Sequence, residues 1–149
     1  MRILQISLLA LIILFSCSKP DEEMMSNAQL DFSSDTITFD TIFSSIGSIT
    51  KTLTIYNNNN FDVISDINLN GASAANFRMN IDGISGNNQN NIFIGKNDSI
   101  FIFIEVTINP SSNSLPYILS DSLIFTTGQN QQAVKLIAWG QDAYFHTAN

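Results

Sequence analysis

Residues 99–108 have the strongest strand pattern of the chain, because apolar side chains recur there at every second position. Successive side chains of a strand point to opposite faces of the sheet, so alternate residues share one face. Phe101 and Phe103 add apolar groups to the opposite face, before Glu105 makes that face polar. A strand that is apolar on both faces at one end is predicted to be central and covered there. The shared face carries Ile100, Ile102, Ile104, Val106 and Ile108.

Similar β-branched and aromatic runs follow one another along the chain, separated by the turn-forming residues Asn, Ser, Gly and Asp. Beyond the first residues no sustained helical period occurs, and residues 72–77 suffice for at most one turn. This spacing predicts an all-β, immunoglobulin-like antiparallel β-sandwich of about eight or nine strands over residues 28–142. The expected strands are 29–32, 36–43, 48–56, 63–69, 77–81, 91–94, 99–108, 121–127 and 132–140, with loops at 82–91 and 110–116 and turns at 57–60 and 127–130. The expected inner faces of 36–43 and 48–56 carry Ile37, Phe39 and Thr41, and Ile49, Leu53 and Ile55.

Residues 1–16 are predicted to be a cleaved signal peptide. Arg2 is followed by an almost wholly apolar run over residues 3–15. That run is about 13 residues long, whereas a membrane-spanning helix needs roughly 20. A basic start, a short apolar run and small residues after it are typical of a secretory signal.

Cys17 is the only cysteine and follows Leu14, Phe15 and Ser16, a segment that resembles a bacterial lipobox. The resemblance implies that the Cys17 thiol receives diacylglycerol, that the peptide before it is removed, and that the new amino terminus is acylated. Several acyl chains anchor a protein stably to a membrane. The alternative is an ordinary secreted protein with a cysteine of no special role.

Residues 17–27 are predicted to form a flexible acidic tether. Lys19 and the acidic residues that follow Pro20 resemble the surface-export signal of lipoproteins in some Gram-negative bacteria. The resemblance implies an outer-membrane lipoprotein exposed at the cell surface, with the periplasmic face of that membrane as the alternative. The formal net charge of −7 argues against nucleic acid as a partner, because binding to phosphates depends on clustered basic residues.

Residues 30–32, 40–48, 98–110 and 138–145 are four stretches that carry a resemblance. Taken together, they resemble the amino-terminal immunoglobulin-like domain of a family of bacterial surface lipoproteins. The domain is similar to the Hydin and abnormal-spindle type, and the resemblance covers nearly the whole chain after the signal. In that family the domain usually continues into a right-handed parallel β-helix, whereas this sequence stops soon after Gly140. The resemblance therefore leaves open that the chain is a truncated relative or part of a longer reading frame.

No catalytic constellation is expected. His146, the only histidine, lies in the polar tail of residues 143–149, and a catalytic base needs a packed scaffold to hold it. Zinc sites need clustered Cys and His residues, so no metal site and no cofactor are expected. Residues 80–87 have oxygen-bearing side chains at alternate positions, as calcium sites do, but a polar turn with glycines at positive φ is the favoured interpretation.

The pattern of aspartate, hydroxyl residue and aliphatic residue occurs at four places and resembles the O-glycosylation acceptor pattern of the same bacterial group. The resemblance implies candidate acceptors at Thr36, Thr41, Ser99 and Ser122. A structural cause competes with it, because Asp and Ser or Thr favour turns and aliphatic residues begin strands.

The leading functional prediction is a non-enzymatic, lipid-anchored immunoglobulin-like module, which acts as a spacer or binds a protein partner at the outer membrane. The alternative is a truncated accessory domain of a β-helix protein that handles carbohydrate. A free glycan-binding module is a third candidate, because protein surfaces that bind sugars usually present exposed aromatic rings. Its candidate rings are Tyr56, Tyr117, Trp139 and Tyr144.

Overall fold

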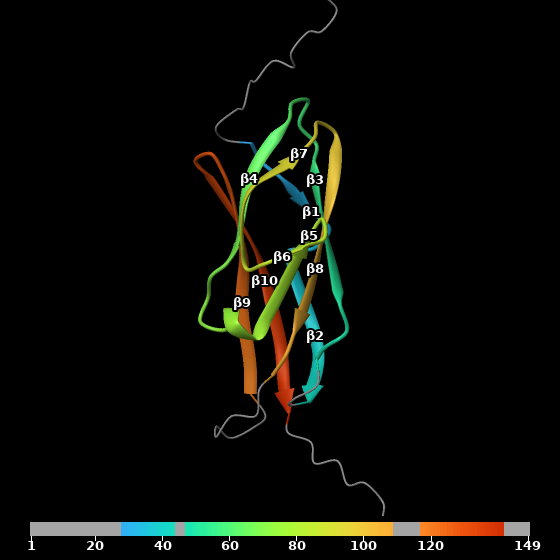
Figure 1. Ribbon diagram of the computed structural model, residues 1–149, viewed down its shortest axis with the longest axis vertical. Helices are drawn as coiled ribbons and strands as arrows, with labels where there is room; N and C mark the ends of the chain where they lie inside the picture. Colours follow the sequence, from blue (N-terminus) through green and yellow to red (C-terminus); the bar gives the residue numbers. More distant parts are fainter. Residues whose placement is uncertain (1–27, 44–46, 109–116, 142–149) are drawn as a thin grey trace, which may run out of the picture.

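The computed structural model describes residues 28–43, 47–108 and 117–141. Within these ranges two five-stranded sheets pack face to face, which confirms the immunoglobulin-like β-sandwich (Figure 1). The predicted signal peptide, the tether and the tail of residues 143–149 lie outside the described residues. The elements are β1 (Asp31–Phe32), β2 (Thr36–Phe43), β3 (Lys51–Asn57), β4 (Val63–Leu69), the 3-10 turn η1 (Ala74–Asn76), β5 (Phe77–Ile81), β6 (Ile84–Ser85), β7 (Asn88–Ile94), β8 (Asp98–Val106), β9 (Tyr117–Thr127) and β10 (Asn130–Gln141).

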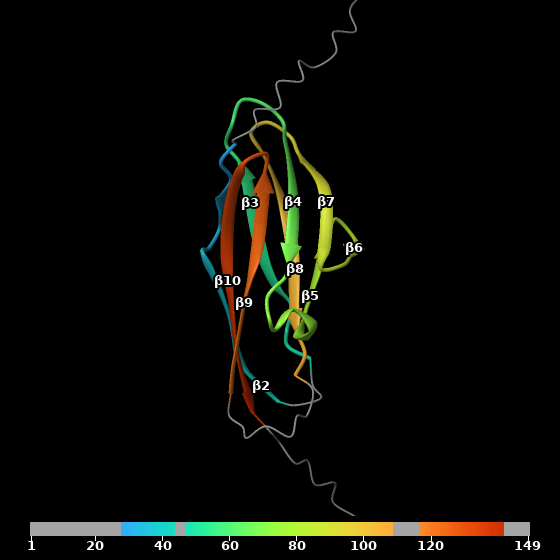
Figure 2. The ribbon, with the colours of Figure 1, turned by 90° about the vertical axis from the view of Figure 1, so that its left-hand side faces the viewer.

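The first sheet has the strand order β1-β3-β8-β5-β6, and the second has the order β2-β10-β9-β4-β7. Figure 2 shows β10, β9, β4 and β7 of the second sheet side by side. Neighbouring strands run antiparallel, as predicted, with one exception among the described pairs: β2 and β10 are parallel. These two strands lie far apart in the sequence, so no tight hairpin forces them to run in opposite directions.

The core lies between the two sheets and consists of alternate residues from their strands. Ile102, Ile104, Val106 and Ile108 are fully buried, which confirms the inner face predicted for the strongest strand. Two aromatic contacts join the sheets. The ring centroids of Phe39 and Phe77 lie 5.9 Å apart, and those of Phe32 and Phe125 lie 4.6 Å apart.

The outer face of β8 differs from the prediction. The strand is central in its sheet, but Phe101 and Phe103 are exposed by 52% and 45% and are not covered. In the described part of the chain, the sandwich has two layers, and no third element lies over the outer face of the first sheet (Figure 1).

Two predicted inner-face positions are also wrong. Thr41 is exposed and Ile42 is buried in its place, because the pairing of β2 with β10 shifts register between Ala138 and Trp139. Such a bulge adds one residue, here Asp40, and so reverses the alternation after it. Ile49 is 70% exposed because it precedes the first residue of β3.

Several strand boundaries were placed wrongly from the sequence. The predicted loop at 82–91 contains β6 and the first residues of β7, and β9 begins at Tyr117 rather than near residue 121. Backbone pairing extends β7 through the polar residues Asn88 and Gln89, whose side chains give no apolar signal. The start of β9 is instead apolar, at Tyr117, Ile118 and Leu119, and the prediction left these residues out. The turn between β9 and β10 is confirmed. Gly128 has a φ of 59° there, as a type II′ hairpin turn requires.

Asn57 closes one end of the sandwich. Its side chain is fully buried at the end of β3, and its amide nitrogen lies 2.9–3.0 Å from the carbonyl oxygens of Phe61, Ile94 and Gly95. Its amide oxygen accepts hydrogen bonds from the backbone and side-chain nitrogens of Asn59. One side chain thus connects the first sheet to the last residue of β7 in the second.

The segment before β1 is held by side-chain amides. Gln132 of β10 accepts a hydrogen bond from the backbone nitrogen of Leu30 at 2.9 Å and donates one to the Leu30 carbonyl at 2.8 Å. Asn130 donates to the carbonyl of Ala28 at 3.0 Å. Because Ala28 and Leu30 are both buried, this segment is part of the packed domain.

We predict that Asn57→Ala lowers the free energy of unfolding by about 2–3 kcal/mol, because it leaves buried carbonyl groups without a donor. Chemical denaturation monitored by circular dichroism measures the change. Asn58→Ala is the matched control, since the Asn58 side chain is exposed and its amide donates to Asp31 at the surface; its effect should stay within about 0.5 kcal/mol. Equal effects of the two substitutions would contradict the role given to Asn57.

Candidate functional site

The predicted acceptor residues do not lie together. Thr36 and Thr41 lie on β2, Ser99 on β8 of the other sheet, and Ser122 on β9. Thr41 is exposed and the other three are half-buried. Cys17 and His146 lie outside the described residues, so the structure does not place them.

Two of the four aspartates before these residues have a structural role. Asp98 and Asp121 each accept a hydrogen bond at 2.7 Å from the backbone nitrogen of the next residue, Ser99 and Ser122. Asp121 is buried and also accepts one from the backbone nitrogen of Ser73 at 3.1 Å. The repeated pattern therefore has a local backbone cause at these two positions.

The segment of residues 80–87 is the polar turn that the sequence predicts. Asp82 and Gly83 both have positive φ, of 51° and 82°, and the Asn80 side chain accepts a hydrogen bond from the Gly83 nitrogen at 3.1 Å. This turn ends β5 and sends the chain back as β6. Among the described residues, no three His, Cys, Asp or Glu side chains are grouped to hold a metal ion.

The aromatic residues suggested for glycan stacking do not form one platform. Tyr56 and Trp139 are each 39% exposed, but they lie on β3 and β10, in different sheets. The side chain of Tyr117 and the whole of Tyr144 lie outside the description. Ile118 lies opposite Trp139 in the register of the second sheet and is 64% exposed.

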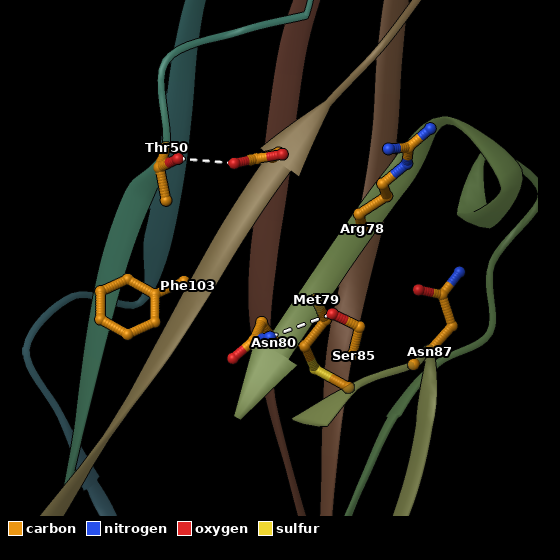
Figure 3. A pocket seen from close by; sticks show the side chains of 9 residues that line it. Thr50, Arg78, Met79, Asn80, Ser85, Asn87 and Phe103 are labelled. Atoms are coloured by element: carbon orange, nitrogen blue, oxygen red, sulfur yellow. Dashed lines mark hydrogen bonds between the residues drawn. The ribbon is translucent and has the colours of Figure 1, made fainter. Parts of the chain in front are cut away.

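A polar depression crosses the outer face of the first sheet near β5 and β6, with a volume of about 610 Å³ (Figure 3). Thr50 donates a hydrogen bond to Glu105 at 2.7 Å on one side of it, and Asn80 donates to Ser85 at 3.0 Å on the other. These acceptors are therefore already engaged within the protein. The lining consists of Thr50, Arg78, Met79, Asn80, Ser85, Gly86, Asn87, Phe103 and Glu105.

An apolar groove of about 460 Å³ lies beside this depression, between β8 and β7. Phe93, Phe101 and Ile84 are exposed by 60%, 52% and 65%, so the groove presents large apolar side chains to solvent. Such a patch rimmed by polar residues is typical of an interaction surface. The groove is lined by Ile81, Asp82, Ile84, Asn91, Ile92, Phe93, Ser99, Ile100, Phe101 and Phe103.

The apolar groove was missed in the sequence. Phe101 and Phe103 were expected to be covered, and residues 82–91 were expected to be a plain loop. The signal present in the sequence was the doubly apolar end of residues 99–108, combined with the lack of any helix to cover it.

No family model matches this chain, and no curated protein matches it. Among solved structures, a family 123 glycoside hydrolase from Clostridium perfringens is similar, with a TM-score of 0.53, 11% identity, and coverage of 78% of this chain and 28% of that one. The human CEP192 ASH/PapD-like domain 7 has a TM-score of 0.53 at 12% identity, and the match covers 87% of this chain and 98% of that one. The E. coli chaperone DraB has a TM-score of 0.50 at 9% identity, and the match covers 74% of this chain and 54% of that one.

These likenesses show a fold, the PapD-like or immunoglobulin-like β-sandwich, which also occurs in a chaperone. The chain spans less than a third of the glycoside hydrolase and about half of DraB. The Hydin type and the β-helix continuation remain predictions. Within residues 28–43, 47–108 and 117–141, no helix is long and apolar enough to cross a bilayer.

We predict that Gly71→Ala destabilises the domain by about 1–3 kcal/mol, because there is no space for the added methyl group. A Cβ atom on Gly71 would lie 2.1 Å from Oδ1 of the buried Asp121. Gly47→Ala is the matched control, since its Cβ would meet only the Thr107 hydroxyl at 3.7 Å. Thermal unfolding distinguishes the two; an unchanged melting temperature for Gly71→Ala would contradict this packing.

Proposed function

We propose that this chain is a non-enzymatic, lipid-anchored protein of the cell envelope, whose immunoglobulin-like domain serves as a spacer or binds a protein partner. The observation that carries the proposal is the path of the chain through the sandwich. The first described residues lie at one end of the long axis, and β10 runs to the other end (Figure 1). The 12 residues of β10 span about 40 Å. A domain with this path separates whatever is attached at its two ends.

The lipid would be attached at the end where the chain enters the sandwich. Signal cleavage before Cys17 leaves the tether of residues 17–27, which leads directly to the buried Ala28. The anchor then lies in the outer membrane of a Gram-negative bacterium, and the acidic tether supports exposure at the cell surface. The periplasmic face of the same membrane is the alternative.

The apolar groove supports the partner-binding role. Exposed apolar side chains beside a polar rim favour protein contacts, and the same fold occurs in a chaperone. This likeness concerns the fold alone.

The second candidate is an accessory domain of a longer β-helix protein that handles carbohydrate. One observation favours it: a sandwich of this kind makes up about a quarter of the glycoside hydrolase structure, where the chain covers 28%. The first described residues and the end of β10 lie at opposite ends of the long axis, which also suits a domain within a longer chain (Figure 1).

We predict that the native protein, extracted from membranes with detergent, has the mass of residues 17–149 plus three acyl chains. Intact-mass spectrometry measures this, and Cys17→Ser should remove both the added mass and the membrane association. A mass of residues 17–149 without lipid would contradict the anchor. A much larger mass would instead favour the second candidate.

The predicted O-glycosylation acceptors are tested on tryptic peptides of the native protein. We predict an added glycan mass on at least one of Thr36, Thr41, Ser99 and Ser122, absent from protein made in a host without O-glycosylation. Thr41 is the most accessible of the four. Unmodified native peptides covering all four residues would reject the prediction.

A further inference from the structure

We propose that the apolar groove binds an extended, basic segment of a protein partner, which adds a strand to the first sheet beside β8. This inference rests on the proposed partner-binding role and specifies the site and the chemistry of the partner. An extended peptide can join the open edge of a sheet through main-chain hydrogen bonds, while pockets select its alternate side chains.

The first sheet lacks a strand at the groove. β8 pairs with β3 along residues 98–104, but its pairing with β5 ends where Ile81 lies opposite Ile102. Residues 98–101 of β8 therefore have a strand on one side only, among the described residues. Four residues of a strand extend over about 13 Å, which suits a short extended segment.

The backbone of Phe101 points toward this open side. Its partner in the register, Thr54, exchanges hydrogen bonds of 3.0 Å with Ser33 on the far side of β3. Residues opposite each other in an antiparallel pair either bond each other or both point away. The backbone N–H and carbonyl of Thr54 point away from β8. The backbone N–H of Phe101 therefore points away from β3 and toward the groove.

The core is incompletely covered at the same place. Ile92 and Ile100 pack against the core but are only partly buried, and both line the groove. On the outer face, Phe93 and Phe101 are exposed. An added strand would cover Ile92 and Ile100 with one set of alternate side chains, so apolar β-branched residues fit that set.

The charge of the groove selects a basic segment. Asp82 is exposed and is the one charged residue among those that line the groove in the described structure. No Lys or Arg is among the residues that line the groove in the described structure. With a net charge of −7 on the whole chain, basic groups flanking the apolar residues of a partner are attracted.

The edges at β7 and β6 are less suited to strand addition. The edge of β7 is interrupted, because its pairing with β4 shifts register between Ser65 and Ile67 and Asn91 has a φ of 57°. Bulges of this kind protect edges from further pairing. The strand β6 has only two residues.

The test uses the full chain in detergent and two labelled peptides, Lys-Thr-Ile-Thr-Val-Thr-Ile-Lys and its counterpart with Glu in place of both Lys. Fluorescence anisotropy should show saturable binding of the basic peptide and at least about tenfold weaker binding of the acidic one. Amide hydrogen exchange by NMR should show new protection of the Phe101 N–H when the basic peptide is bound.

Two variants test the site. Phe101→Lys should weaken binding of the basic peptide about tenfold, whereas the control Ile118→Lys, an equally apolar-to-basic change on the other sheet, should not. Asp82→Asn should reduce the preference for the basic peptide without altering the turn, since Asn also tolerates positive φ. Circular dichroism and thermal unfolding confirm that each variant is folded.

Equal binding of the two peptides, no protection at Phe101, or equal effects of Phe101→Lys and Ile118→Lys would overturn the inference. Self-association of the chain through this face, or binding of a soluble oligosaccharide that is lost in Phe101→Lys, would replace it with a different ligand. Failure here leaves the lipid anchor and the spacer role intact, because the mass of the native protein tests those separately.

Discussion

The rest of the structure depends on one constraint, which applies at the ends of the apolar layer between the sheets. A backbone carbonyl or N–H that borders a dry interior must find a hydrogen-bond partner, since leaving it unpaired costs free energy. Asn57 meets this need where β3, β7 and the following turn converge. Asp121 does the same for the Ser73 nitrogen in the segment between β4 and β5. Alternating apolar residues form the layer between the sheets. These two polar side chains supply hydrogen-bond partners to backbone groups at its ends.

The inner face of β8 was predictable because a period of two needs no information beyond the strand itself. The first residues of β7 were not predictable, because Asn88 and Gln89 pair through their backbones at a sheet edge and carry no apolar pattern. The role of Asn57 depends on the Ile94 carbonyl, 37 residues away, which local sequence cannot indicate. The candidate groove was predictable in part. Phe101 was visible as an apolar residue, but its exposure depends on how many layers the fold has.

The groove and the incomplete core share one cause. The turn at Asp82 and Gly83, with both residues at positive φ, ends β5 and reverses the chain into β6. Had β5 continued, a strand would pair with the first residues of β8 and cover Ile100. A short polar turn thus determines where the sandwich keeps apolar surface in contact with water, at a free-energy cost that a bound partner would offset.

The parallel pairing of β2 and β10 has a mechanical consequence. Seven register pairs join these strands, from Lys135 with Thr36 to Gln141 with Phe43. A pulling force between the first described residues and the end of β10 acts along the long axis of the domain and drives the two strands past each other (Figure 1). Their hydrogen bonds are then loaded in shear, all at once, instead of opening one after another as in a zipper. The domain is therefore built to resist extension between its ends.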